Sequence, residues 1–154
     1  MLWIHAPTPI NSAIASTSGS NSGVGFSIPV NAVRRIVPVL IKDGKYVYSY
    51  MGAAFDNEVS LDEQTTFGLS QTQGAYVLSV TPNSPAAKAG LIAADTRTGQ
   101  GGDLIIAIDG HSIGNFEDLN SYLVSHTTVG QTIQLTVLRN GQKLIVPGTL
   151  SVRP

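Results

Sequence analysis

Short apolar runs alternate with turn signals between residues 46 and 152, and this pattern constrains the fold more than any other feature of the sequence. Leu104-Ile-Ile-Ala-Ile108 is an apolar run that ends at Asp109-Gly110, a dipeptide that favours the tight turn of a β-hairpin. Tyr76-Val-Leu-Ser-Val80 is a second run of this kind. Because each run has the length of a strand, the pattern predicts a sheet of short strands joined by turns.

Two helices and several further strands are predicted around these runs. Asn83-Ser-Pro-Ala-Ala-Lys-Ala-Gly90 combines a helix cap, a proline suited to the first helical turn and a terminating glycine. Asn115 is expected to cap a second helix, from Phe116 to about Ser125. The sequence shows no internal repeat, so these elements indicate a mixed sheet with two helices rather than a solenoid. The further strands are expected at Tyr46–Phe55, His111–Ile113, Thr132–Leu138 and Leu144–Val152.

The first 42 residues differ from the rest of the chain in their residue pattern. A loop of small and hydroxylated residues, Ala15–Gly25, leads into the alternating segment Val24–Ile28, which is expected to form a strand. A helix is predicted from about Ala32 to Ile41, with Pro38 inside it. The apolar residues of this helix recur at helical spacing and form one stripe: Val33, Ile36, Val37, Leu40 and Ile41.

Composition excludes several classes of function. The 154 residues carry a net charge of −1 and only 12% charged residues, against roughly 25% in typical domains, so we expect no nucleic-acid partner. The sequence has no cysteine, which rules out disulfides, thiolate metal sites and a cysteine nucleophile. No apolar run approaches the roughly 18 residues of a membrane span, and Met1–Pro9 lacks the features of an export signal. We therefore expect no membrane segment in this chain.

Five motifs in the later part of the chain and two segments upstream of them carry a recognisable pattern. The five motifs are Tyr50-Met-Gly-Ala53, Ser84-Pro-Ala-Ala-Lys-Ala-Gly-Leu91, Gly102-Asp-Leu-Ile-Ile-Ala-Ile-Asp-Gly110, Phe116-Glu-Asp-Leu119 and Leu135-Thr-Val-Leu-Arg-Asn-Gly141. The two upstream segments are Ile10-Asn-Ser-Ala-Ile-Ala-Ser16 and Ser20-Asn-Ser-Gly-Val-Gly-Phe-Ser-Ile-Pro29. The five motifs occur in the order in which bacterial-type PDZ domains carry them. The two upstream segments and the predicted helix look like the tail of the trypsin-like barrel of HtrA/Deg serine proteases, which in that family directly precedes the PDZ domain. The chain therefore resembles the C-terminal part of an HtrA/Deg protease.

The resemblance implies an α+β, mainly β fold in two parts. Residues 43–154 would form the PDZ domain, a partly open five- to six-stranded sheet with two helices, and residues 1–42 would be a strand and a helix from the protease barrel. The catalytic His and Asp of the family and its Gly-Asn-Ser-Gly-Gly-Pro nucleophile segment do not occur here. We therefore expect no catalytic residues in this chain, although the parent protein would be a serine endopeptidase. An extracytoplasmic compartment, periplasm or cell envelope, is also implied.

Other candidate chemistry finds less support in the sequence. Ser20-Asn-Ser-Gly23 looks like a serine nucleophile, but its neighbours match a later loop of the family and no second glycine and proline follow it. His5, His111 and His126 have neither the context of a catalytic base nor the spacing of zinc ligands. Gly99-Gln-Gly-Gly102 precedes a predicted strand, whereas phosphate-binding loops precede a helix. We therefore expect no metal and no cofactor.

Tyr50-Met-Gly-Ala53 is the most informative segment for function. A glycine in a turn lets successive backbone N–H groups converge, and such a nest can hold a terminal carboxylate without a cationic side chain. By resemblance, this segment is the carboxylate-binding loop of a PDZ domain. The strand after it, Ala53-Ala-Phe55, would offer a free edge to an incoming peptide, and its two alanines would leave room at the groove. The polar segment Phe55–Gln73, with a short helix near residue 61, would bend over this groove.

The other wall of the groove is expected on the helix after Asn115. Leu119 and Leu123 lie four residues apart on one helix face, and Tyr122 lies one step round. An apolar C-terminal side chain would dock between Met51 and this helix. The alternative is that both leucines simply fill the domain core. The candidate peptide-binding residues are Tyr50, Met51, Gly52, Ala53, Ala54, Phe55, Leu119, Tyr122 and Leu123.

These features support three hypotheses of different classes. In the first, the chain is a module that binds hydrophobic C-terminal or unfolded polypeptide segments by β-strand addition, and so recruits substrates to, or regulates, the parent protease domain. In the second, the apolar face of the N-terminal helix drives self-association or docking onto a barrel. The third, an active peptidase in its own right, has the least support.

Overall fold

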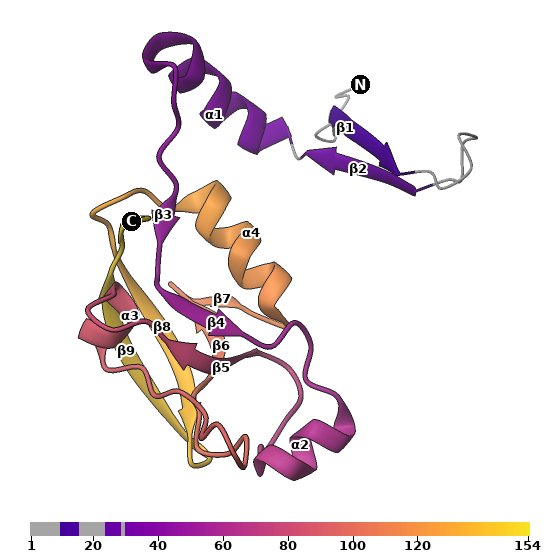
Figure 1. The fold of residues 1–154 in the computed structure, drawn as a ribbon, viewed down its shortest axis with the longest axis vertical. Coiled ribbons are helices and arrows are strands. Elements are labelled where there is room, and N and C mark those ends of the chain that lie inside the picture. Colours follow the sequence, from indigo (N-terminus) through magenta and orange to yellow (C-terminus); the bar gives the residue numbers. More distant parts are fainter. Residues whose placement is uncertain (1–9, 16–23, 29) are drawn as a thin grey trace, which may run out of the picture. The chain divides into compact units, whose positions relative to one another are not determined.

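The computed structural model describes residues 10–15, 24–28 and 30–154, and the chain divides into two compact units, residues 1–46 and 47–154. The first unit contains β1 (Ile10–Ala15), β2 (Val24–Ile28) and α1 (Val30–Asp43) (Figure 1). Strands β1 and β2 pair antiparallel, and the predicted strand at Val24–Ile28 is confirmed. The segment Ser20-Asn-Ser-Gly23 and His5, both weighed above as candidate catalytic groups, lie outside the described residues.

Helix α1 is longer than predicted at both ends, and Pro38 lies inside it. The helix stops where Gly44, at φ +69°, donates its N–H to the Leu40 carbonyl at 3.0 Å, as glycine commonly does after a helix. Part of the apolar stripe is exposed, most of all Ile41, at 81% of its surface.

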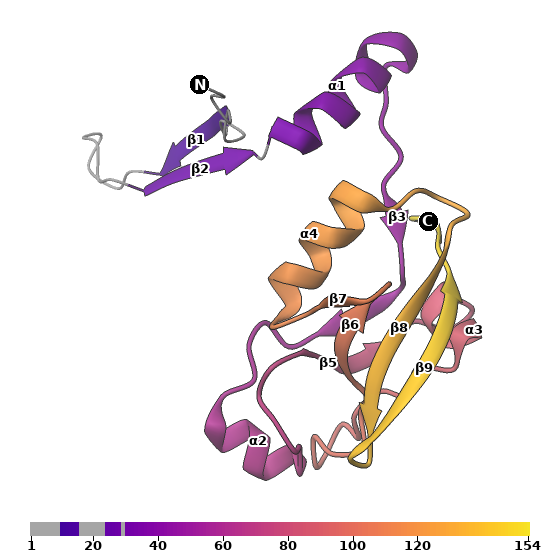
Figure 2. The same cartoon turned by 180° about the vertical axis from the view of Figure 1, so that it is seen from behind.

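The second unit is built on an antiparallel sheet of six strands, in the order β4-β5-β6-β8-β9 with β7 paired to β6. A separate pair joins β3 to β10. The predicted fold class is therefore confirmed, and a short helix forms at the position expected near residue 61 (Figures 1 and 2). The elements are β3 (Ser49–Tyr50), β4 (Ala53–Phe55), α2 (Leu61–Phe67), β5 (Ala75–Val80), α3 (Pro85–Ala89), β6 (Leu104–Ile108), β7 (His111–Ser112), α4 (Phe116–His126), β8 (Thr132–Arg139), β9 (Gln142–Thr149) and β10 (Ser151–Val152).

Two hairpin turns form for the reason that the sequence indicated. Asp109 and Gly110 have φ of 48° and 84°, and they join β6 to β7; Asn140 and Gly141 have φ of 50° and 77°, and they join β8 to β9. Positive φ at both central residues is the requirement of the type I′ turn, which Asp-Gly and Asn-Gly meet at low cost.

The last predicted strand, Leu144–Val152, is in fact two strands. Strand β9 ends at Thr149, and the Leu150 N–H bonds to the Gln131 carbonyl at 2.9 Å while the Leu150 side chain enters the core at 2% exposure. The chain then turns to pair Ser151 with Tyr50 in the β10–β3 ladder. This break places the end of the domain beside the segment in which the candidate site begins.

The core lies in two clusters. The larger one joins the sheet to α3 and α4, and the smaller one lies where α2 and the loop before β6 pack on the sheet. The larger cluster includes Val77, Ile105, Ile108, Leu119, Ile133, Leu135 and Val137; the smaller one consists of Val59, Tyr76, Ala94, Leu104 and Leu138.

One ion pair is held at the edge of this core. The Asp103 side chain is fully buried and accepts two hydrogen bonds from the Arg139 guanidinium, both at 2.7 Å, and one from the Ile92 N–H at 2.9 Å. Arg139 also donates to the Gly90 carbonyl at 2.8 Å. Hydrogen bonding to Asp103 raises the pKa of Arg139 above its ordinary range. The pair thereby fixes the segment between α3 and β6 against β8.

Candidate functional site

The Tyr50–Ala53 loop joins β3 to β4, and the carbonyls of its two middle residues are directed toward neighbouring elements. The Met51 carbonyl accepts the Ala86 N–H, at the start of α3, at 2.8 Å. The Gly52 carbonyl accepts the Thr81 N–H at 2.9 Å and the Ser84 hydroxyl at 3.0 Å. Gly52 has φ +81°, a conformation open to glycine and strained for other residues.

The N–H groups of the same loop are turned the other way. Within the described part of the chain, the N–H groups of Met51 and Gly52 donate no hydrogen bond. Antiparallel ladders alternate, and Gly52 bonds to β5 through Thr81, so the next residue, Ala53, directs its N–H away from β5. Successive N–H groups in a turn can form a concave nest that binds anions, and the N–H groups of Met51, Gly52 and Ala53 are called the nest below.

Strand β4, which follows the nest, is a terminal strand of the sheet. Helix α4 runs alongside it in both views (Figures 1 and 2). Two contacts fix α4 there: the hydroxyls of Ser49 and Thr127 lie 2.7 Å apart at one end, and the rings of Phe55 and Phe116 stack at 5.5 Å at the other. The edge of β4 between these contacts, with Ala53 beside the nest, is open to hydrogen bonding.

The predicted site residues fall into two groups by burial. Tyr50, Ala53 and Phe55 are half-buried and Ala54 is exposed, as an accessible edge requires. The side chains of Met51, Leu119 and Leu123 belong to the larger core cluster, at 5%, 0% and 9% exposure. Both leucines therefore pack in the core, and their predicted place in the wall of a groove stays a prediction.

Tyr122 lies on another side of α4. Its ring packs on His111 of β7 at 5.0 Å and on His126 at 4.8 Å, and its hydroxyl donates to the Asp109 carboxylate at 3.4 Å. Partial burial, together with the Asp109 charge, raises the pKa of Tyr122 above its ordinary value. These contacts tie Tyr122 to the β6–β7 hairpin, and its predicted role in the groove stays a prediction.

The segment after β4 passes the start of α4 and then leaves it. The Phe116 N–H donates to the Asn57 carbonyl at 3.4 Å, but α2 packs farther on, where Phe67 stacks on Tyr76 at 5.0 Å. Ser60 and Glu63 form a capping box at the start of α2, and their hydrogen bonds lower the pKa of Glu63. The short helix expected near residue 61 is therefore anchored to the sheet beside the loop before β6.

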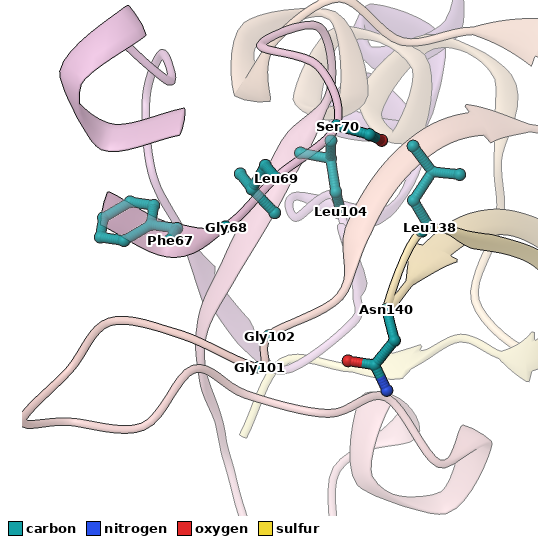
Figure 3. A pocket seen from close by; sticks show the side chains of 10 residues that line it. Phe67, Gly68, Leu69, Ser70, Gly101, Gly102, Leu104, Leu138 and Asn140 are labelled. Atoms are coloured by element: carbon teal, nitrogen blue, oxygen red, sulfur yellow. The ribbon is translucent and has the colours of Figure 1, made fainter. Parts of the chain in front are cut away.

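A small pocket beside α2 is the one shown in Figure 3. Its volume is about 40 Å³, and Phe67, Leu69, Leu104 and Leu138 contribute side chains to its walls. At roughly 10–15 Å³ for each water molecule, this space suits a few waters and is too small for a peptide.

Residues 10–15, 24–28 and 30–154 contain no group of three or more His, Asp or Glu side chains placed to hold a metal ion. None of the helices in these ranges has both the length and the apolarity needed to cross a bilayer.

Sequence reasoning missed Ser84 as part of this site. Its position before a proline predicts a helix cap, and Ser84 does cap α3 by accepting the Ala87 N–H at 3.2 Å. Its bond to Gly52 spans 32 positions in sequence, and no local pattern reports such a contact.

Comparison with known proteins places this geometry in a family. Residues 49–147 match the PDZ domain family. The chain is 38% identical over 149 residues to Protease Do-like 1, chloroplastic, of Arabidopsis thaliana, covering 94% of the chain and 32% of that relative. It is 36% identical over 141 residues to the periplasmic pH-dependent serine endoprotease DegQ of Escherichia coli, covering 92% and 29%. The chain thus spans about a third of the length of these curated relatives.

Solved structures agree with the sequence relatives. The HtrA-type protease AlgW with decapeptide superimposes with a TM-score of 0.72 at 31% identity, covering 95% of this chain and 42% of that one. AlgW with tripeptide gives a TM-score of 0.69 at the same identity. The chain belongs to the PDZ domain family, and nearly its whole length is similar to a part of the HtrA/Deg serine proteases.

Proposed function

We propose that the domain binds the C-terminal end of a polypeptide, which adds as a strand to the open edge of β4. The observation that carries the proposal is the nest: the N–H groups of Met51, Gly52 and Ala53 lie next to one another where an unpaired strand edge begins. A carboxylate accepts such donors without a cationic side chain, which fits a chain of net charge −1. The solved relatives named with a decapeptide and a tripeptide support this assignment.

The open edge of β4 supports one direction and one length for the bound segment. The C-terminal carboxylate of the peptide lies at Gly52, and the residues before it lie along β4 toward Phe55. The peptide is therefore antiparallel to that strand. Only Ala53–Phe55 belongs to the strand, and the Phe55–Phe116 stack stands at its far end. At about 3.4 Å per residue, this edge accommodates the last three or four residues of a ligand.

The burial of the apolar side chains limits the affinity. Since Met51, Leu119 and Leu123 are already packed in the core, the ligand gains mainly main-chain hydrogen bonds and the carboxylate contact. Ordering a flexible peptide subtracts from these contacts. We expect a dissociation constant near micromolar, about −8 kcal/mol.

In its biological setting, the module would capture hydrophobic C-terminal or unfolded segments and so recruit substrates to, or regulate, a serine endopeptidase domain of the same protein. The names of the relatives as serine proteases support this role. The periplasmic location in the name of DegQ supports an extracytoplasmic compartment.

The test is a titration of the full chain with fluorescent peptides that end in an apolar residue, each as a free acid and as an amide. The free acid is expected to bind at least tenfold more tightly, since the amide carries no charge for the nest. Equal affinities would contradict the proposal.

A glycine variant provides a matched test of the loop. In Gly52→Ala the new Cβ would lie 2.2 Å from the Ser84 Cβ, so the loop must shift and binding should be lost. Gly141→Ala is the control, because Gly141 has a similar φ of +77° and open space around it. It carries a comparable backbone penalty far from the loop and should retain the affinity of the unmodified chain.

A second candidate function is self-association or docking through α1, favoured by the exposure of Val37, Leu40 and Ile41 on its apolar stripe. Sedimentation of the full chain beside its Ile41→Glu variant tests this idea. If the unmodified chain sediments as a monomer at all concentrations, self-association is excluded.

A further inference from the structure

We propose that Ser84 is a positioning residue for carboxylate binding: its hydroxyl orients the N–H groups of the Tyr50–Ala53 loop. This inference rests on the proposed function and assigns to it a residue outside the groove. Ser84 lies at the N-terminus of α3, is 5% exposed, and contacts the loop from the side opposite the nest.

The hydrogen bonds of Ser84 fix the direction of its single hydroxyl proton. The oxygen accepts the Ala87 N–H at 3.2 Å, and a serine hydroxyl carries one donor and can accept as well. Its proton is therefore directed to the Gly52 carbonyl at 3.0 Å. The same side chain caps α3 and holds the loop.

Peptide planarity carries this constraint to the nest. The carbonyl of one residue and the N–H of the next belong to one planar trans unit and point in opposite directions. Holding the Gly52 carbonyl with Ser84 and Thr81 therefore aims the Ala53 N–H toward the open edge. Holding the Met51 carbonyl with the Ala86 N–H likewise aims the Gly52 N–H.

The fit between the loop and Ser84 is close. A Cβ added at Gly52 would lie 2.2 Å from the Ser84 Cβ and 2.7 Å from its hydroxyl oxygen. The loop therefore rests directly on this side chain. Without the hydroxyl, the Gly52 carbonyl keeps only the Thr81 N–H, so the peptide unit can tilt and the donors lose their common direction.

The experiment measures the ratio of free-acid to amide peptide affinity in the full chain. Ser84→Ala removes donor and cap, Ser84→Asp keeps a capping acceptor but loses the donor, and Ser84→Thr keeps both. Ser60→Ala is the matched control, because the Ser60 hydroxyl caps α2 through the Glu63 N–H at 3.2 Å without contacting the loop.

Ser84→Ala and Ser84→Asp are expected to weaken free-acid binding roughly five- to tenfold, the worth of one hydrogen bond, and to leave amide binding unchanged. Ser84→Thr and Ser60→Ala should keep the original ratio. An unchanged ratio in Ser84→Ala, or an equal loss for both peptides, overturns the positioning role. If the unmodified chain itself does not distinguish acid from amide, the proposed function fails first, and the two failures are thus told apart.

Discussion

Removing Arg139 should be among the most damaging single changes in the domain. In Arg139→Met the aliphatic stem is largely kept, but Asp103 retains only the Ile92 N–H as a partner, although its side chain is fully buried. Breaking a buried ion pair on one side costs about 3–5 kcal/mol. Because the Arg139 side chain is 24% exposed, and water partly screens the pair, we expect the lower end, about 3 kcal/mol. That is a large share of the 5–15 kcal/mol typical of a domain.

Urea unfolding of the full chain, followed by far-UV circular dichroism, measures this loss. Arg139→Lys serves as a control that keeps the charge but not the two-point geometry, and it should lose less. Adding Asp103→Asn to Arg139→Met removes the buried charge while an amide oxygen remains for Ile92, and should recover much of the stability. A loss below about 1 kcal/mol in Arg139→Met, or no recovery in the double variant, would refute the reasoning that the unpaired carboxylate is the cost.

Two further predictions concern the two core clusters. Leu119→Ala, at a position with 0% exposure, should lower the free energy of unfolding by about 2–5 kcal/mol in the same urea experiment, and a smaller loss would show that the site collapses around the missing side chain. Burial raises the pKa of the Tyr76 phenol above its ordinary value of 10.0. As the pH rises, the phenol therefore ionises in the unfolded chain before it ionises in the folded one. Its contribution to stability is complete below pH 10 and is lost as the pH rises through the folded pKa. Tyr76→Phe loses the hydrogen bonds of the hydroxyl to Gly99 and Gly102 and should be less stable at neutral pH. Its free energy of unfolding should, however, fall less steeply as the pH rises above 10.

Local features of the fold could be predicted because each depends on a few adjacent residues. Asp109-Gly110 and Asn140-Gly141 fix their hairpins through their own φ angles, and Asn115 caps α4 with its own side chain, which accepts the Asp118 N–H. The break at Leu150 could not be predicted, because it depends on a partner strand a hundred positions earlier.

The candidate site shows the same division. The glycine turn depends on adjacent residues, and the sequence indicates it. That the strand after it lies at the edge of the sheet depends on the strand order, and only the family resemblance implied it. Helical spacing puts Leu119 and Leu123 on one face, but spacing alone does not tell that both side chains are buried in the core, because burial depends on the sheet that packs against the helix. Tyr122 shares a helix with them yet turns to the β6–β7 hairpin, a contact made through Asp109 and His111.

The β3–β10 pair has a mechanical consequence. Ser49–Tyr50 and Ser151–Val152 are hydrogen-bonded neighbours, so the first and last strands of the second unit lie side by side. A force that pulls these two strands apart acts first on a ladder of two residue pairs, which breaks one pair after the other. The six-stranded sheet does not bear the force until this ladder has opened. The next residues under tension are Met51 and Gly52. Under the proposed function, tension across these two strands would thus distort the nest before it unfolds the domain, and would thereby change the affinity for a peptide.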